Sequence, residues 1–120
     1  MNLEIKNILS TAIDQYPEDI YNFVVPLMVE IGEKGKEGGE TFHFLVVSPQ
    51  GLQNEASSGH GFIILRGYIL MNKFDWDVIY RAIENLINHA RSRKDWDGVI
   101  SYINRYGWYD SEDIDEKHFP

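Results

Sequence analysis

The most constraining feature of this chain is a run in which apolar residues occupy every second position. The run contains Phe23, Val25, Leu27, Val29 and Ile31. Successive side chains of a β-strand point to opposite faces of a sheet, so this period predicts a strand with one apolar face. Pro26 lies inside the run and cannot donate a backbone hydrogen bond, so we expect the strand to lie at a sheet edge or to be bulged there.

A second strand is predicted after a glycine-rich, charged loop. The loop covers residues 32–40, and Phe42, Phe44 and Val46 then alternate within residues 41–47. Two alternating segments joined by such a loop indicate an antiparallel hairpin.

Four other segments lie before residue 75, and the last of them is a third strong strand pattern. Residues 3–13 are expected to form an irregular first strand, residues 49–52 one helical turn, and residues 54–61 a polar loop. Residues 62–71 are apolar on both faces apart from Arg66, which predicts a strand that is central or covered.

From Asp75 onward the apolar period becomes that of a helix. Asp75 and Asp95 each precede a tryptophan and are suitable N-caps for two helices. Gly107 is the expected C-cap of the second helix. The predicted apolar stripes are Trp76, Ile79, Ile83, Leu86, Ile87 and Ala90, and Trp96, Val99, Ile100, Ile103 and Tyr106. Tryptophans on such stripes are expected to belong to the core.

Strands followed by helices indicate an α+β fold. We expect an antiparallel β-sheet with two C-terminal helices packed on one face. The 120 residues suit a single domain over residues 1–120, with a core over about residues 1–107 and an acidic C-terminal segment over residues 108–120.

Composition narrows the classes of partner. The formal net charge of −8 disfavours nucleic acid and anionic membranes as partners, and favours a cationic partner or simply solubility. The chain has no cysteine, which excludes disulfides and cysteine-based zinc sites. Neither a signal peptide nor a membrane-spanning apolar run is apparent, so we expect a cytoplasmic protein.

The sequence offers no convincing catalytic set or cofactor site. His60 lies between glycines near two serines, but the segment lacks the strand-to-helix turn that exposes a nucleophile. The loop over residues 32–40 lies between two strands, whereas a phosphate-binding loop opens a helix. The four histidines are scattered without metal-ligand spacing: His43, His60, His89 and His118. We therefore expect neither enzymatic activity, nor a cofactor, nor a metal.

The end of the chain combines two large aromatics with a dense negative charge. Trp108 and Tyr109 directly precede a run of five carboxylates, namely Asp110, Glu112, Asp113, Asp115 and Glu116. An aromatic anchor beside acids suits a surface that binds a basic protein. Trp108 follows the expected helix end, so it belongs either to the core or to the rim of that surface. The predicted partner-binding residues also include Glu33, Glu37 and Glu40 of the hairpin loop.

Several segments together resemble the immunity protein 8 family of bacteria. The first block contains residues 16–19, 31–35, 42–44 and 48–49, which read Tyr-Pro-Glu-Asp, Ile-Gly-Glu-Lys-Gly, Phe-His-Phe and Ser-Pro. The second contains residues 74–76, Trp96 and residues 107–110, the last reading Gly-Trp-Tyr-Asp. The resemblance spans about residues 16–113 and rests on the order and spacing of aromatics, glycines and prolines.

The resemblance implies an antitoxin. Such proteins are encoded beside polymorphic or contact-dependent inhibition toxins, and would bind the cognate toxin domain in the cytoplasm without catalysis of their own. The acidity agrees with a toxin that cuts nucleic acid, since such enzymes carry basic surfaces. Two alternatives remain open: a generic acidic interaction module or assembly subunit, and a small enzyme or small-molecule binder that uses His60, Tyr68 or the sheet face. Nothing in the sequence fixes the oligomeric state.

Overall fold

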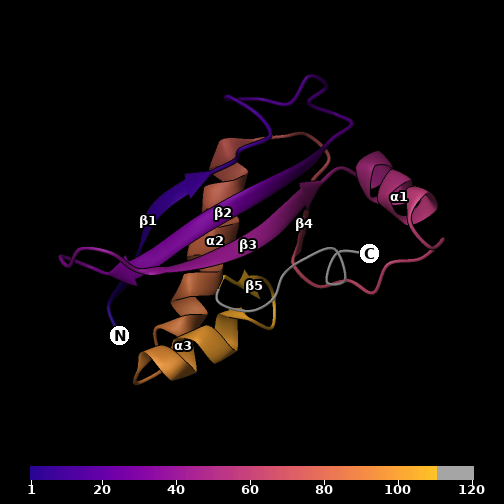
Figure 1. Cartoon of the computed structure of the whole chain (residues 1–120). Helices are drawn as coiled ribbons and strands as arrows, with labels where there is room; N and C mark the ends of the chain where they lie inside the picture. The colour runs from indigo at the N-terminus through magenta and orange to yellow at the C-terminus, as the bar shows by residue number, and fades with distance from the viewer. Residues whose placement is uncertain (111–120) are drawn as a thin grey trace.

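The predicted hairpin forms the centre of the structure, a computed structural model that describes residues 1–110 (Figure 1). Strand β2 (Val24–Glu33) pairs antiparallel with β3 (Glu40–Val47), in a register that runs from Val24 opposite Val47 to Ile31 opposite Glu40. The glycine-rich turn between the strands covers residues 34–39. The period of two therefore located both strands of the hairpin.

Three shorter strands extend the hairpin into a mixed sheet. Strand β1 (Leu3–Leu9) pairs antiparallel with β2. Two strands pair with the other edge of β3. Strand β4 (Tyr68–Leu70) pairs parallel with the second half of β3. Strand β5 (Trp108–Tyr109) pairs antiparallel with Phe42 and His43 in the first half of β3. The expected α+β class is confirmed, and the β3–β4 pairing adds one parallel contact to a sheet that was expected to be antiparallel.

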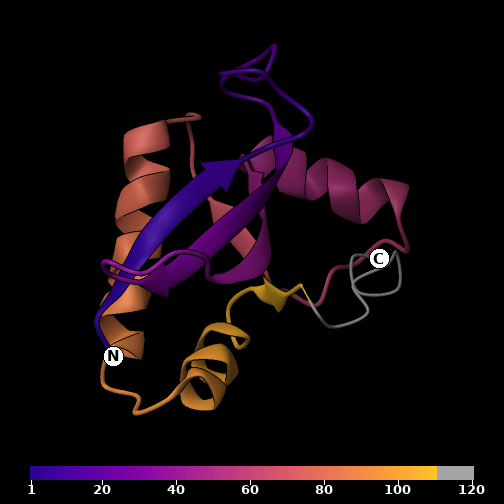
Figure 2. The ribbon, with the colours of Figure 1, turned by 60° about the vertical axis from the view of Figure 1, so that its left-hand side comes forward.

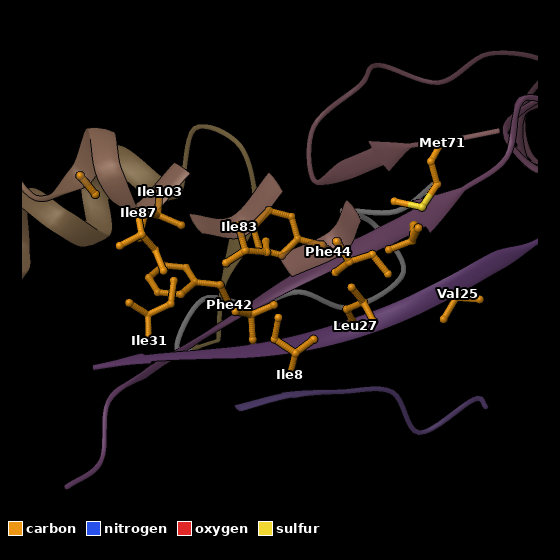
Figure 3. Close-up of a cluster of buried hydrophobic side chains, with 14 of the residues drawn as sticks. Ile8, Val25, Leu27, Ile31, Phe42, Phe44, Met71, Ile83, Ile87 and Ile103 are labelled. Atoms are coloured by element: carbon orange, nitrogen blue, oxygen red, sulfur yellow. The ribbon is translucent and has the colours of Figure 1, made fainter. Parts of the chain in front are cut away.

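The two predicted C-terminal helices pack against the sheet. Helix α2 (Trp76–Ala90) begins at its N-cap Asp75, whose carboxylate accepts the Asp77 N–H at 2.9 Å. Helix α3 (Trp96–Ile103) begins at Asp95, whose carboxylate accepts the Gly98 N–H at 2.9 Å. Their apolar stripes meet the inner face of the sheet in one core. Figure 3 shows that core, with Phe42 and Phe44 of β3 beside Ile83 and Ile87 of α2 and Ile103 of α3.

The other face of the sheet carries the alternate residues of the same strands. On β2, Val25, Leu27, Val29 and Ile31 are almost fully buried on the inner face, whereas Pro26 is exposed on the opposite face. We call the face of Pro26, which points away from α2, the outer face. Helix α1 (Pro49–Ser58) lies beyond the end of β3, away from α2 (Figure 2).

Two predictions between β3 and α2 were wrong. Residues 54–58 of the polar loop expected over residues 54–61 are helical, since α1 runs to Ser58. Its N-cap is Ser48, whose hydroxyl accepts the Gly51 N–H at 2.9 Å. The strand expected over residues 62–71 is reduced to β4, and residues 62–66 form no strand. The first half of β3 is already paired with β5, so only its second half is left for this segment.

Three further details of strands β1 and β2 differ from the predictions. Strand β1 ends at Leu9 rather than at residue 13. Strand β2 is not an edge strand, because it lies between β1 and β3. Its pairing with β1 ends where Leu9 lies opposite Met28, so no strand pairs with Pro26 on the β1 side. The register shift lies in β1 instead, between Ile5 and Asn7.

Gly107 has a packing role rather than the expected capping role. Helix α3 is capped by Asn104. A Cβ on Gly107 would lie 2.5 Å from the Phe44 ring, so only glycine allows this close approach to β3.

Candidate functional site

Trp108 belongs to the core of the protein and not to the rim of a binding surface, the two positions between which the sequence did not decide. Its side chain is only 7% exposed. The Arg66 guanidinium lies 3.6 Å from the centroid of the indole ring, and the indole N–H donates to the Arg66 carbonyl at 3.3 Å. A stacked cation and a hydrogen bond fix the ring in place. Trp108 therefore holds β5 in position and presents little surface to a partner.

Tyr109 connects β5 to the start of β3. Its hydroxyl donates to a carboxylate oxygen of Glu40 at 2.7 Å, and its backbone N–H donates to the side-chain oxygen of Asn104 at 3.0 Å. Its ring lies 5.5 Å from that of Phe42. The sequence placed Glu40 and Tyr109 in two separate acidic regions, and the structure joins those regions through this hydrogen bond.

Asp110 presents its charge at the end of β5. Its backbone N–H donates to the Thr41 carbonyl at 2.9 Å, and its carboxylate lies 2.5 Å from Nε2 of His43. The Asp110 side chain is 54% exposed, so its carboxylate is both held in place and accessible.

The three hairpin carboxylates lie around one small hollow. Glu33, Glu37 and Glu40 line it together with Lys36 and with Trp96 of α3, and its volume is about 180 Å³. We call this set the acidic hollow. The Lys36 ammonium donates a hydrogen bond to the Glu33 carboxylate in an ion pair of 2.8 Å, and this hydrogen bond raises the pKa of Lys36. Glu37 is exposed. The three hairpin acids thus lie around one hollow, and Glu40 links it to β5.

The remaining predicted partner-binding residues are Glu112, Asp113, Asp115 and Glu116, which lie outside the described residues.

The residues weighed for catalysis or metal binding are not assembled in the described part of the chain. His60 is exposed, and its ring lies 6.1 Å from that of Phe62. Within residues 1–110 no three histidine, aspartate or glutamate side chains come together as a metal-binding group. In the same residues no helix combines the length and the apolar character needed to cross a membrane. Trp76 and Trp96 are half-buried and pack against the core.

A groove on the outer face was not predicted from the sequence. It has a volume of about 330 Å³ and lies between the hairpin, α1 and β4. Pro26, His43 and Leu45 line it from the hairpin, Glu55 from α1 and Tyr68 from β4. Strand alternation could have placed the first three on one face. Glu55 lay in a segment predicted as a loop, and Tyr68 lay in a strand that was predicted to be longer than β4.

The comparison with family models decides the affiliation of the chain. A model described as immunity protein 8 matches residues 2–114. The chain belongs to the immunity protein 8 family. The match covers both the acidic hollow and the groove, so each surface lies in the family domain. No match was found among curated proteins or among solved structures.

Tyr109→Phe should lower the free energy of unfolding by about 1 kcal/mol, the typical net value of one hydrogen bond, or somewhat more because the acceptor is charged. The change removes only the hydroxyl that donates to Glu40 and keeps the contact with the Phe42 ring. Urea unfolding followed by circular dichroism measures the effect. Tyr21→Phe, on an exposed side chain, is the matched control and should change nothing. Equal stability of both variants would show that the Tyr109–Glu40 contact does not hold β5.

Proposed function

We propose that this protein is an antitoxin that binds a cognate bacterial toxin domain and blocks it without covalent chemistry. Membership of an immunity protein family over residues 2–114 carries the proposal. The partner is a protein, and the producing cell's cytoplasm is where the antitoxin has to meet the toxin that would otherwise act there.

The acidic hollow and the carboxylates from Asp110 onward support a basic partner surface. Glu37 and Asp110 are exposed, and the chain carries a formal net charge of −8. Complementary charge speeds the encounter of two proteins and selects the partner. Toxins that cut nucleic acid need a basic surface for the phosphates, and an acidic protein can cover it. We therefore propose a nuclease as the class of toxin.

Trp108 and Tyr109 have an indirect part in this proposal. They fix β5 against β3, and thereby set the position of Asp110. Contacts with the toxin are assigned to Asp110, to the acidic hollow and to the four acids that follow Asp110.

Co-expression with the toxin domain encoded by the adjacent reading frame tests the proposal. We expect growth to be restored, and the two proteins to co-purify as a complex in which the nuclease activity of the toxin is lost. An unrelated acidic protein of similar size is the control. Unreduced toxicity at a matched expression level would end the proposal.

A further inference from the structure

The groove on the outer face is separate from the acidic hollow. Both are built on β3, but the groove is lined by His43 and Leu45 in the later part of the strand, and the hollow lies at Glu40, where the strand begins. At about 3.4 Å per residue, His43 and Leu45 lie roughly 10 Å and 17 Å from Glu40 along the strand. Substitutions can therefore affect one surface and leave the other intact.

The groove combines apolar walls with one carboxylate. Pro26 and Leu45 supply aliphatic surface, Tyr68 an aromatic ring and Glu55 the charge, and the imidazole of His43 lies beside the Asp110 carboxylate. Burial, and then the negative charge of Glu55, raise the pKa of Tyr68 above its ordinary value. No lysine or arginine is among the described residues that line the groove, and no described cation forms an ion pair with Glu55.

This chemistry fits a long cationic side chain. Arginine and lysine place their aliphatic stems along apolar surface and need an acceptor for the charged end. A carboxylate gives the strongest hydrogen bond to a guanidinium, and an aromatic face adds a cation–π contact.

The loop between α1 and β4 adds exposed apolar surface. Its two ends adjoin the elements that supply Glu55 and Tyr68, and so connect two walls of the groove. Within it, Phe62, Ile64 and Leu65 are 57%, 81% and 62% exposed. Single exposed apolar residues are common, but three large ones within four positions are typical of an interaction surface.

We propose that the groove and this loop form a docking surface for the cognate toxin. The toxin inserts an arginine or lysine side chain beside Glu55, and covers Phe62, Ile64 and Leu65 with apolar residues of its own. The Glu55 carboxylate, which pairs with no cation of residues 1–110, and the net charge of −8 select a cationic segment rather than an acidic one. This inference rests on the proposed antitoxin function and assigns it a second contact surface.

Binding of the purified toxin domain, measured by titration calorimetry, tests the groove. Glu55→Gln keeps the shape of the side chain and removes its charge, so the dissociation constant should rise about tenfold or more. A loop variant, Phe62→Ser with Leu65→Ser, should also weaken binding about tenfold. Glu18→Gln removes an equal charge from an exposed position outside the groove and should bind like the unmodified protein. Thermal unfolding should be the same for all four proteins, because every altered side chain is partly or largely exposed.

The results separate this inference from the antitoxin proposal. Binding that is weakened by both groove variants and unchanged by Glu18→Gln supports the docking surface. Tight binding by the unmodified protein and by both groove variants overturns the docking surface and leaves the antitoxin function standing. Absence of binding by the unmodified protein overturns both. Hydrogen exchange on the complex gives an independent reading, since residues 52–68 should be protected, and unchanged exchange there would also contradict the groove.

Discussion

Replacing Phe42 by alanine should lower the free energy of unfolding by about 3–5 kcal/mol, which is the usual cost of such a truncation in a packed core. The Phe42 ring is fully buried on the inner face, in the core that residues of β2 and the two C-terminal helices share with it (Figure 3). Val29 lies directly opposite on β2, and the Tyr109 ring is 5.5 Å away. The cavity would therefore loosen the pairing of β3 on both sides.

The chain contains a matched control for this substitution. Phe62→Ala removes the same atoms from a loop in which the side chain is 57% exposed, so stability should change by no more than about 0.5 kcal/mol. Denaturant unfolding of both variants, followed by circular dichroism, measures the difference. A loss for Phe42→Ala no larger than for Phe62→Ala would mean that the inner face is not packed as described.

The contrast between these two phenylalanines shows what the sequence could reveal about the fold. Phe42 lies in an alternating run, and periodicity assigned it to the apolar face of a strand. Phe62 lies in a run that is apolar on both faces, and such a run gives no direction to any side chain. Two segments compete to pair with the free edge of β3. Strand β5 occupies the first half of that edge, and a strand of only two residues has no period that a sequence could reveal.

The candidate site was predictable to a smaller extent. Charge and aromatic content identified the acidic residues, but not that Tyr109 joins Glu40 to β5, because this contact spans 69 positions of the chain. Trp108 could not be placed from its neighbours, since its burial depends on Arg66, 42 positions earlier. The groove needs three elements to meet, and two of them, α1 and β4, were predicted with the wrong extent. The single-domain organisation stays a prediction.

Neutralising the acidic end should slow association with the toxin by about 10- to 100-fold at low salt, while dissociation changes less. The variant replaces aspartate by asparagine and glutamate by glutamine at Asp110, Glu112, Asp113, Asp115 and Glu116. Long-range attraction accelerates the encounter of oppositely charged proteins before any contact forms, so the loss appears in the association rate. Stopped-flow mixing with the purified toxin domain measures that rate.

Salt and position together show whether attraction by these five acids is the cause. Screening shortens the range of charge interactions from about 10 Å at 0.1 M to about 3 Å at 1 M, so the variant and the unmodified protein should associate at similar rates in high salt. A control variant removes the same total charge elsewhere, at Asp14, Glu18, Asp77, Glu84 and Asp97. If attraction is local to the acidic end, this control keeps most of its association rate. Equal slowing of the two variants would mean that only net charge steers the encounter. Unchanged association of the first variant would remove the acidic end from the binding surface and leave the groove to account for recognition.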